Sequence, residues 1–487
     1  MHGKSFKSIL LVTAMIFLVA AGILQQRLNR QRSELGLTRV APLENAPPAL
    51  AFTTVALGGF RGLIANALWI RANDLQQEDK YFEQVQLSDW ITKLEPTFVQ
   101  VWLMQAWNMA YNISVKFRDP YDRWRWVQRG IELLRDQGLQ YNPREALLYR
   151  ELAWFFQHKM GQNLDDAHLV YKYEWAKEIS RVLDGGRPDY NELLNPRTPE
   201  ARRRVELLRD KFKMDPAIMK RADELYGPLE WRLPEASAIY WAMVGLEKSN
   251  EKDLITLRRV IYQCLQLSVM RGKIVVERPD GTLGFGPDLG KIGLAHDGYV
   301  RMLAEETEKK SVVERAHINF LREAIYLLYT HNRLIEADRW MKTLRQQYPN
   351  AVEPGISVEQ FALARMTANL SELNHNRTKA VLEGLMIQHF ENLAIDNDER
   401  ADGLMLMIRQ IWNYYTSRVT QRPDALQLEP LNEMYARIRD QLIDPKTGFR
   451  PEYAARIRTK LNLPPPPATN APAAPANSAT PVAPPKP

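Results

Sequence analysis

The stretch from Phe98 to Ile179 constrains the fold most, because aromatic residues recur in it at helical spacing and prolines divide it. The segments bounded by Asp119-Pro120 and Asn142-Pro143 are too long for strands and too polar on one face for membrane spans. They therefore predict helical hairpins with large aromatic side chains. Six of the twelve tryptophans of the chain lie in this stretch: Trp102, Trp107, Trp124, Trp126, Trp154 and Trp175.

Composition places the chain among ordinary globular proteins. Its 487 residues are 45% hydrophobic and 25% charged, which is enough for several cores. The net charge of +7 is small for this length, and no dense basic run with interleaved aromatics is present, so we expect no nucleic-acid partner. The single cysteine, Cys264, excludes an intramolecular disulfide framework and a zinc site built on several cysteines.

The amino-terminal segment carries the signal of a membrane anchor. Ile9 to Leu24 contains sixteen residues without a charge, preceded by two lysines and followed by three arginines. Its length is near the lower limit of a bilayer span and long for the core of a signal peptide. We predict an uncleaved transmembrane helix in residues 1–30, with a removed signal peptide as the alternative, and a stalk in residues 31–48.

Orientation in the membrane is less constrained, since basic residues lie on both sides of the apolar segment. Because a short amino-terminal tail generally stays cytoplasmic, we expect a membrane-anchored protein with a periplasmic or extracytoplasmic body. The run from Ala49 to Ile70 is also apolar. It could be a second span or an interfacial segment, but Arg61 and Asn66 in its middle favour a buried first helix.

Internal repeats provide the main evidence for the architecture. From Ile318 to Asn350, apolar residues line two successive helices, with a small residue, Ala337, where the helices would approach most closely. Pro349 then follows as a stop. This spacing resembles the tetratricopeptide repeat (TPR), a family of helix-turn-helix units. The resemblance implies that stacked hairpins form a superhelix with a concave binding groove.

Other segments match the repeat less closely, around Trp102, around Tyr149, and in a degenerate pair from Pro234 to Met270. Each unit leaves an apolar face that a neighbour must cover, so several units must stack. We therefore predict a TPR-like α-solenoid in residues 49–272 and 291–351; ordinary amphipathic hairpins in an irregular all-helical domain are the alternative. The predicted repeat-packing residues are Trp102, Ala106, Tyr149, Ala153, Leu321, Ala324, Ala337, Met341 and Pro349.

Three regions depart from the repeat. Residues 273–290 contain a β-branched run, a Pro-Asp-Gly turn and a second short run, which predict an inserted β-hairpin and a candidate partner contact. In residues 352–462 we predict further helices, which would cover the last apolar face of the solenoid. Residues 463–487 are rich in Pro and Ala and predict a disordered tail with polyproline character. The fold class that we predict for the whole chain is therefore all-α with one inserted β-hairpin.

No motif for catalysis is present. The eight histidines show no zinc-ligand spacing, and the chain has neither a P-loop nor a GxSxG elbow. We therefore expect no catalytic, metal or cofactor-binding residues and no cofactor. The function predicted is a membrane-anchored scaffold that binds a protein partner in the cell envelope, with the insertion from Lys116 to Tyr121 as the part to watch.

Three alternatives remain open. The first is a subunit of an envelope transport or secretion complex, in which residues 49–70 pack on a membrane partner. The second is a hydrolase acting on cell wall or glycan, which needs two convergent carboxylates. The third is a nucleic-acid binder, which needs a continuous basic face.

Overall fold

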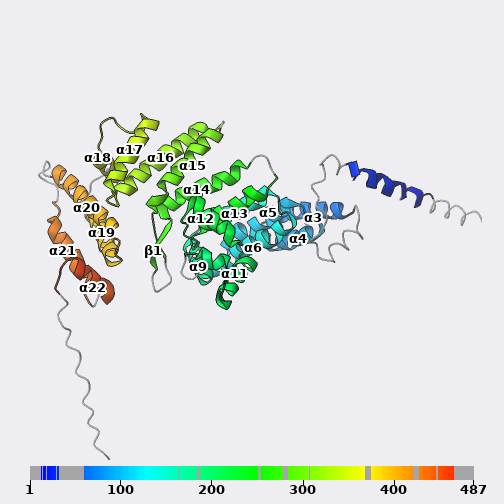
Figure 1. The fold of residues 1–487 in the computed structure, drawn as a ribbon, viewed down its shortest axis with the longest axis horizontal. Coiled ribbons are helices and arrows are strands. Elements are labelled where there is room, and N and C mark those ends of the chain that lie inside the picture. The colour runs from blue at the N-terminus through cyan, green and yellow to red at the C-terminus, as the bar shows by residue number, and fades with distance from the viewer. Residues whose placement is uncertain are drawn as a thin grey trace, which may run out of the picture. The chain divides into compact units, whose positions relative to one another are not determined.

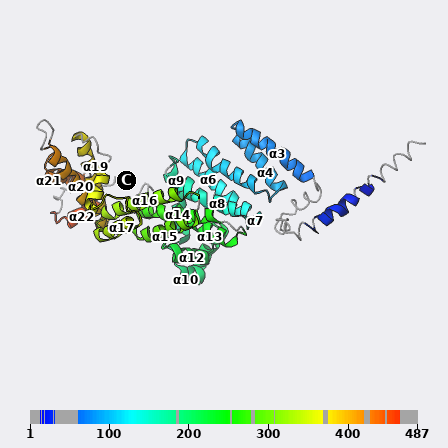
Figure 2. The same ribbon diagram turned by 90° about the horizontal axis from the view of Figure 1, so that it is seen from above.

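Over the residues that it describes, the computed structural model consists of helices and one two-stranded sheet (Figures 1 and 2). The all-α class with one inserted β-hairpin is therefore confirmed. The chain divides into two compact units, unit 1 (Met1–Thr307) and unit 2 (Glu308–Pro487). The structure describes residues 13, 15–17, 19–28, 30–31, 60–162, 164–183, 187–250, 254–277, 283–306, 308–367, 375–419, 427–445 and 448–464.

Several sequence predictions fall on residues outside these ranges. They are the first part of the predicted anchor, the stalk, the apolar run before Phe60, and the tail from residue 465 onward. The described residues between 13 and 31 are helical. Over the described ranges, no helix combines the length and the apolar character that crossing a membrane requires.

Unit 1 opens with an antiparallel helix pair, α3 (Phe60–Gln77) and α4 (Tyr81–Leu94). Their shared core contains Ala65, Ala72 and Ile91, against which Trp69 packs. The helices that follow are α5 (Val99–Trp107), α6 (Pro120–Glu132), α7 (Leu139–Tyr141), α8 (Ala146–Trp154), α9 (His168–Leu183), α10 (Tyr190–Leu194), α11 (Pro199–Asp210), α12 (Pro216–Tyr226), α13 (Pro234–Lys248), α14 (Ile255–Arg271) and α15 (Ile292–Glu305).

Proline and a capping side chain start several of these helices. The Asp119 carboxylate accepts hydrogen bonds from the backbone N–H of Tyr121 at 2.7 Å and of Asp122 at 3.1 Å, and Pro120 is the first residue of α6. Thr198 caps α11 and Asp215 caps α12 in the same way. Proline fits here because the first helical N–H groups have no partner within the helix.

Three π-helical segments of six residues each interrupt the aromatic stretch within the described chain: η1 (Asn108–Ile113), η3 (Leu133–Gly138) and η4 (Phe155–Met160). A π turn holds more residues than an α turn, so every side chain after it is rotated about the helix axis. The apolar spacing of a regular α-helix therefore shifts across each of these segments. A short 3₁₀ turn, η2 (Ser114–Lys116), follows η1.

The pairing of α13 with α14 matches the degenerate hairpin expected there, but α13 also packs against α8, which lies far earlier in the chain. Gly245 permits this approach, because a Cβ at that position would lie 2.7 Å from the Cβ of Tyr149. After α14, strands β1 (Lys273–Glu277) and β2 (Leu283–Gly286) form the antiparallel hairpin, and the 3₁₀ turn η5 (Leu289–Lys291) leads into α15.

Unit 2 begins with a helix pair, α16 (Lys310–Tyr329) and α17 (Leu334–Gln347), where the sequence predicts its clearest repeat. The boundary between the units falls inside the predicted repeat region 291–351, because α15 belongs to unit 1. The remaining helices are α18 (Val358–Thr367), α19 (His375–Ala394), α20 (Asp398–Val419), α21 (Leu431–Leu442) and α22 (Pro451–Lys460).

Candidate binding groove

The residues predicted to pack the repeats are almost all in the interior. Eight of them are buried: Trp102, Ala106, Tyr149, Ala153, Leu321, Ala324, Ala337 and Met341. Pro349 differs, because it lies exposed in a turn two residues after the end of α17.

Trp102 and Asn142 join neighbouring hairpins of unit 1 through one acceptor. The Trp102 indole Nε1 and the Asn142 side-chain amide each donate to the carbonyl oxygen of Pro96, both at 2.8 Å. Both side chains are buried. These contacts hold the scaffold together and leave no face of the Trp102 ring for a ligand.

A buried polar network lies at the insertion that follows α5. Lys159 in η4 donates to Asp165 at 2.6 Å, and Tyr171 donates to the same carboxylate at 3.0 Å. Arg123 bonds both Asp165, at 3.2 Å, and the backbone carbonyl of Phe117, at 2.7 Å. The network therefore ties the insertion to the loop before α9.

The charges of this network compensate one another. Burial alone would raise the pKa of Asp165, but the bond from Lys159 and the other donors lower that pKa to about 2. Burial lowers the pKa of Lys159, and the bond to Asp165 opposes this shift. The network borders a cavity of about 390 Å³. The carboxylates and cations of the network already pair with each other. We therefore assign the network a structural role, which is to hold the insertion against the loop before α9.

The β-hairpin also contacts its own unit. The Lys172 ammonium lies 5.5 Å from the centre of the Phe285 ring in β2, and Lys273 in β1 pairs with Asp288 at 3.3 Å. Burial lowers the pKa of Lys172 to about 8. A contact between the hairpin and a partner stays a prediction.

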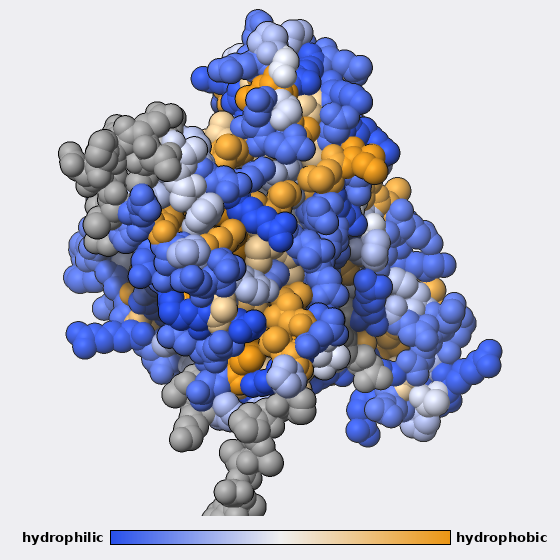
Figure 3. Space-filling model, turned by 90° about the vertical axis from the view of Figure 1, so that its left-hand side faces the viewer, coloured by the Kyte–Doolittle hydropathy of each residue, from blue (hydrophilic) through white to orange (hydrophobic). Residues whose placement is uncertain are grey.

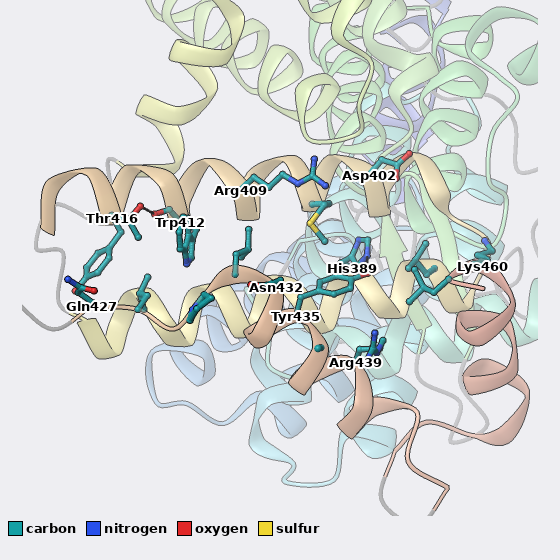
Figure 4. Close-up of a pocket in the computed structure, with 18 residues that line it drawn as sticks. His389, Asp402, Arg409, Trp412, Thr416, Gln427, Asn432, Tyr435, Arg439 and Lys460 are labelled. Carbon is teal, nitrogen blue, oxygen red and sulfur yellow. Dashed lines mark hydrogen bonds between the residues drawn. The ribbon is translucent and has the colours of Figure 1, made fainter. Parts of the chain in front are cut away.

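Unit 2 contains a groove of about 1050 Å³ that sequence reasoning did not identify. Helix α19 packs against α20 on one side and against α21 and α22 on the other, so α19 forms the floor between two walls (Figure 4). Figure 3 shows one face of the molecule, on which apolar side chains gather between hydrophilic ones.

The wall formed by α20 is a regular stripe. Five of its six lining residues are spaced three, four, three and four positions apart, which places them on one face of the helix, and Tyr415 is the sixth. Figure 4 labels Asp402, Arg409, Trp412 and Thr416 along this helix. The stripe consists of Asp402, Met405, Arg409, Trp412 and Thr416.

The floor and the opposite wall meet at a hydrogen-bonded pair. His389 Nδ1 lies 2.8 Å from the carbonyl oxygen of Ala401, and His389 Nε2 lies 3.1 Å from the hydroxyl of Tyr435. A carbonyl only accepts, so Nδ1 carries the proton and Nε2 accepts from Tyr435. Burial lowers the pKa of His389, against the opposing effects of the Ala401 bond and the Asp402 charge. The imidazole is therefore neutral near pH 7.

Basic groups predominate at the rim of the groove. Lys460 pairs with Asp396 at 2.8 Å, and Arg439 pairs with Asp440 at 2.7 Å. Arg409 forms no ion pair with any residue that the structure describes. The described lining contains one carboxylate, that of Asp402. The groove thus combines an apolar surface with a charged rim, where carboxylates neutralise Lys460 and Arg439.

The spacing of the α20 stripe could have been found in the sequence. Met405, Arg409, Trp412 and Thr416 follow a pattern that an ordinary core-facing helix also shows. Only the packing of α19 against both neighbours reveals that this face borders a groove.

Comparisons with protein-family models, with curated proteins and with solved structures find no match to this chain.

Proposed function

We propose that this chain is a membrane-anchored, TPR-like scaffold of the cell envelope that recruits another protein through the groove of unit 2. The observation that carries the proposal is the apolar groove between α20 and α21, floored by α19. The apolar amino-terminal segment from Ile9 to Leu24 supports the anchor. The helix pairs α16–α17 and α13–α14 support the repeat-like body.

The occupant that fits this groove is an amphipathic helix with acidic residues beside its apolar face. Three helices supply a floor and two walls, and a fourth helix would cover the exposed apolar side chains. From Asp402 to Thr416 the α20 wall extends about 21 Å at about 1.5 Å per residue, the length of about four helical turns. Arg409 is the lining cation without an ion pair among the described residues, and it favours an acidic side chain on the partner.

The experiment is site-specific photocrosslinking from the groove in cells. A crosslinking residue is placed at Met405 or at Thr416 in the full chain, and at the exposed Ile335 as a control, and the crosslinked peptides are identified by mass spectrometry. We expect the two groove positions to capture one segment with helical apolar spacing and acidic flanks. Capture of unrelated peptides, or of the same peptides from Ile335, would contradict the proposal.

Affinity measurements with a synthetic peptide of the captured segment then test the two components of binding. Trp412→Ala removes an aromatic anchor and is expected to weaken binding by about 30-fold, the equivalent of about 2 kcal/mol. Arg409→Glu is expected to weaken binding more at low salt than at high salt. Ile335→Ser is the matched surface control and should bind as the unmodified chain does.

The hydrolase alternative receives no support from the groove. Its described lining offers one carboxylate, Asp402, whereas glycoside hydrolysis needs a pair. An envelope transport or secretion complex remains compatible with the scaffold, since the captured peptide would then belong to such a complex.

A further inference from the structure

Helix α3 is apolar on two opposite faces over its first three turns. Its inner face packs on α4 through buried Ala65 and Ala72. On its outer face, Leu63 and Ile70 are 66% and 63% exposed, and Ala67 between them is also exposed. At 100° per residue these three side chains lie within one narrow arc, opposite to the inner face. An exposed apolar face opposite to the core is typical of a surface that contacts a partner or a membrane.

The exposed apolar arc has polar edges. Asn66 lies along one edge and Arg71 along the other, and the Arg71 guanidinium remains half exposed although it lies 3.6 Å from Glu78. Charge then interrupts the arc, because the exposed Asp74 follows Ile70 on the same face, and just after the helix Lys80 pairs with Glu78 at 2.8 Å. The apolar character is thus confined to the half of α3 that is nearer to the amino terminus of the chain.

The chain leading into this face is itself apolar. Residues 45–60 contain no charged side chain, and the anchor predicted in residues 1–30 precedes them in the sequence. We infer that the outer face of α3 lies on a lipid bilayer, with Leu63, Ala67 and Ile70 in the interface and Arg71 at the level of anionic headgroups. This lipid contact adds to the anchor of the proposed function and does not depend on the groove.

A bilayer surface suits these residues better than a membrane span does. A span would carry Arg61 and Asn66 into the hydrocarbon, where polar groups are costly. In an interfacial helix only one arc meets the acyl chains, and the polar edges stay in the headgroup region. The inner face can then keep its contacts with α4.

The test uses the full chain with a fluorescent label at single positions. The native thiol of Cys264 is fully buried, so an added cysteine is the reactive one. Leu63→Cys and Ile70→Cys are labelled with an environment-sensitive dye, and Ile335→Cys, at a residue 82% exposed, is the matched control. Each labelled chain is added to vesicles of phosphatidylcholine with and without phosphatidylglycerol, and some vesicles carry a spin-labelled quenching lipid.

We expect the emission at positions 63 and 70 to shift to the blue on vesicles and to be quenched by the spin-labelled lipid, while position 335 stays unchanged. An Arg71→Glu variant of each chain should reduce the advantage of phosphatidylglycerol. Lipid contact is overturned if the chain binds vesicles and positions 63 and 70 keep the emission seen in water. That outcome would leave the anchor standing, because the anchor alone would then hold the chain.

Two other outcomes also oppose the inference. Blue-shifted emission without vesicles, insensitive to the quenching lipid, would mean that protein covers the face, either residues 49–59 or a second copy of the chain. Failure of the whole chain to bind vesicles would overturn both the lipid contact of α3 and the anchor. Co-sedimentation of the unlabelled chain with vesicles separates this last case from the others.

Discussion

Gly403, near the start of α20, allows two helices of unit 2 to approach closely. A Cβ at this position would lie 1.9 Å from the carbonyl oxygen of Thr330, at the end of α16. The Arg400 guanidinium donates to the same oxygen at 2.8 Å, so the contact also includes a charged hydrogen bond. This contact fixes the start of the wall that borders the groove.

We expect Gly403→Ala to destabilise the protein by about 1–3 kcal/mol, because the added methyl group meets backbone atoms that must shift. Gly384→Ala in α19 is the matched control, since nothing lies within 4 Å of its Cβ position. That change should stabilise the protein by about 0.5–1 kcal/mol, because alanine favours a helix over glycine. Chemical denaturation of the two variants measures both effects, and a similar loss in both would contradict the steric explanation.

His389 gives unit 2 a dependence on pH. Burial lowers its pKa in the folded protein, whereas the unfolded chain has a pKa of about 6.5. The unfolded state therefore binds the proton more tightly. The contribution of His389 to stability is present above pH of about 6.5 and is lost as the pH falls below that value.

We expect the unmodified protein to lose more stability between pH 7 and pH 5 than His389→Asn does. The asparagine amide can keep the hydrogen bond to Ala401 but does not titrate. Thermal unfolding at the two pH values measures the difference. The other histidines whose pKa is lowered by burial occur in both proteins and cancel in the comparison: His158, His168 and His296. Equal losses in the two proteins would contradict the assignment.

At the scale of elements, one buried carboxylate joins η4 to the loop before α9. Asp165 and Asp166 both pair with Arg123, but only Asp165 also accepts from Lys159, which is buried. The side chain of Asp166 is 84% exposed. The two neighbouring residues therefore offer a matched comparison between a buried ion pair and an exposed one.

Asp165→Ala is expected to destabilise the protein by about 3–5 kcal/mol, because it leaves the Lys159 ammonium buried without its partner. For Asp166→Ala we expect a loss of at most about 1 kcal/mol, since solvent screens that pair. Melting temperatures of the two variants provide the measurement. Comparable losses would show that the Lys159 contact adds little to the network.

At the scale of the whole molecule, the two proposed binding surfaces belong to different units. The apolar face of α3 belongs to unit 1, and the groove between α20 and α21 belongs to unit 2. Each unit has its own buried core, around Trp102 and Tyr149 in unit 1 and around Leu321 and Leu404 in unit 2. Lipid contact and partner binding are thus assigned to different compact units, and changes in one surface need not disturb the other.

The sequence alone determined the features that depend on residues close together along the chain, namely helices, turns and helix starts. Helical spacing of apolar residues predicted the all-α class, a Pro-Asp-Gly turn between β-branched runs predicted the hairpin of β1 and β2, and Asp119-Pro120 marked the start of α6. The helix pair from Ile318 to Asn350 was located for the same reason, since its periodicity and turn are local properties.

Tertiary structure decided the rest, because it depends on contacts between distant residues. The packing of α13 on α8 requires the absence of a side chain at Gly245. The π segments η1 and η4 bring the Lys159 ammonium to 5.0 Å from the centre of the Tyr111 ring. The α20 stripe that ends in Thr416 has the same spacing whether it faces a core or a groove. The stripe borders a groove because α19 packs against α20 and also against α21 and α22, which leaves the space between these helices open.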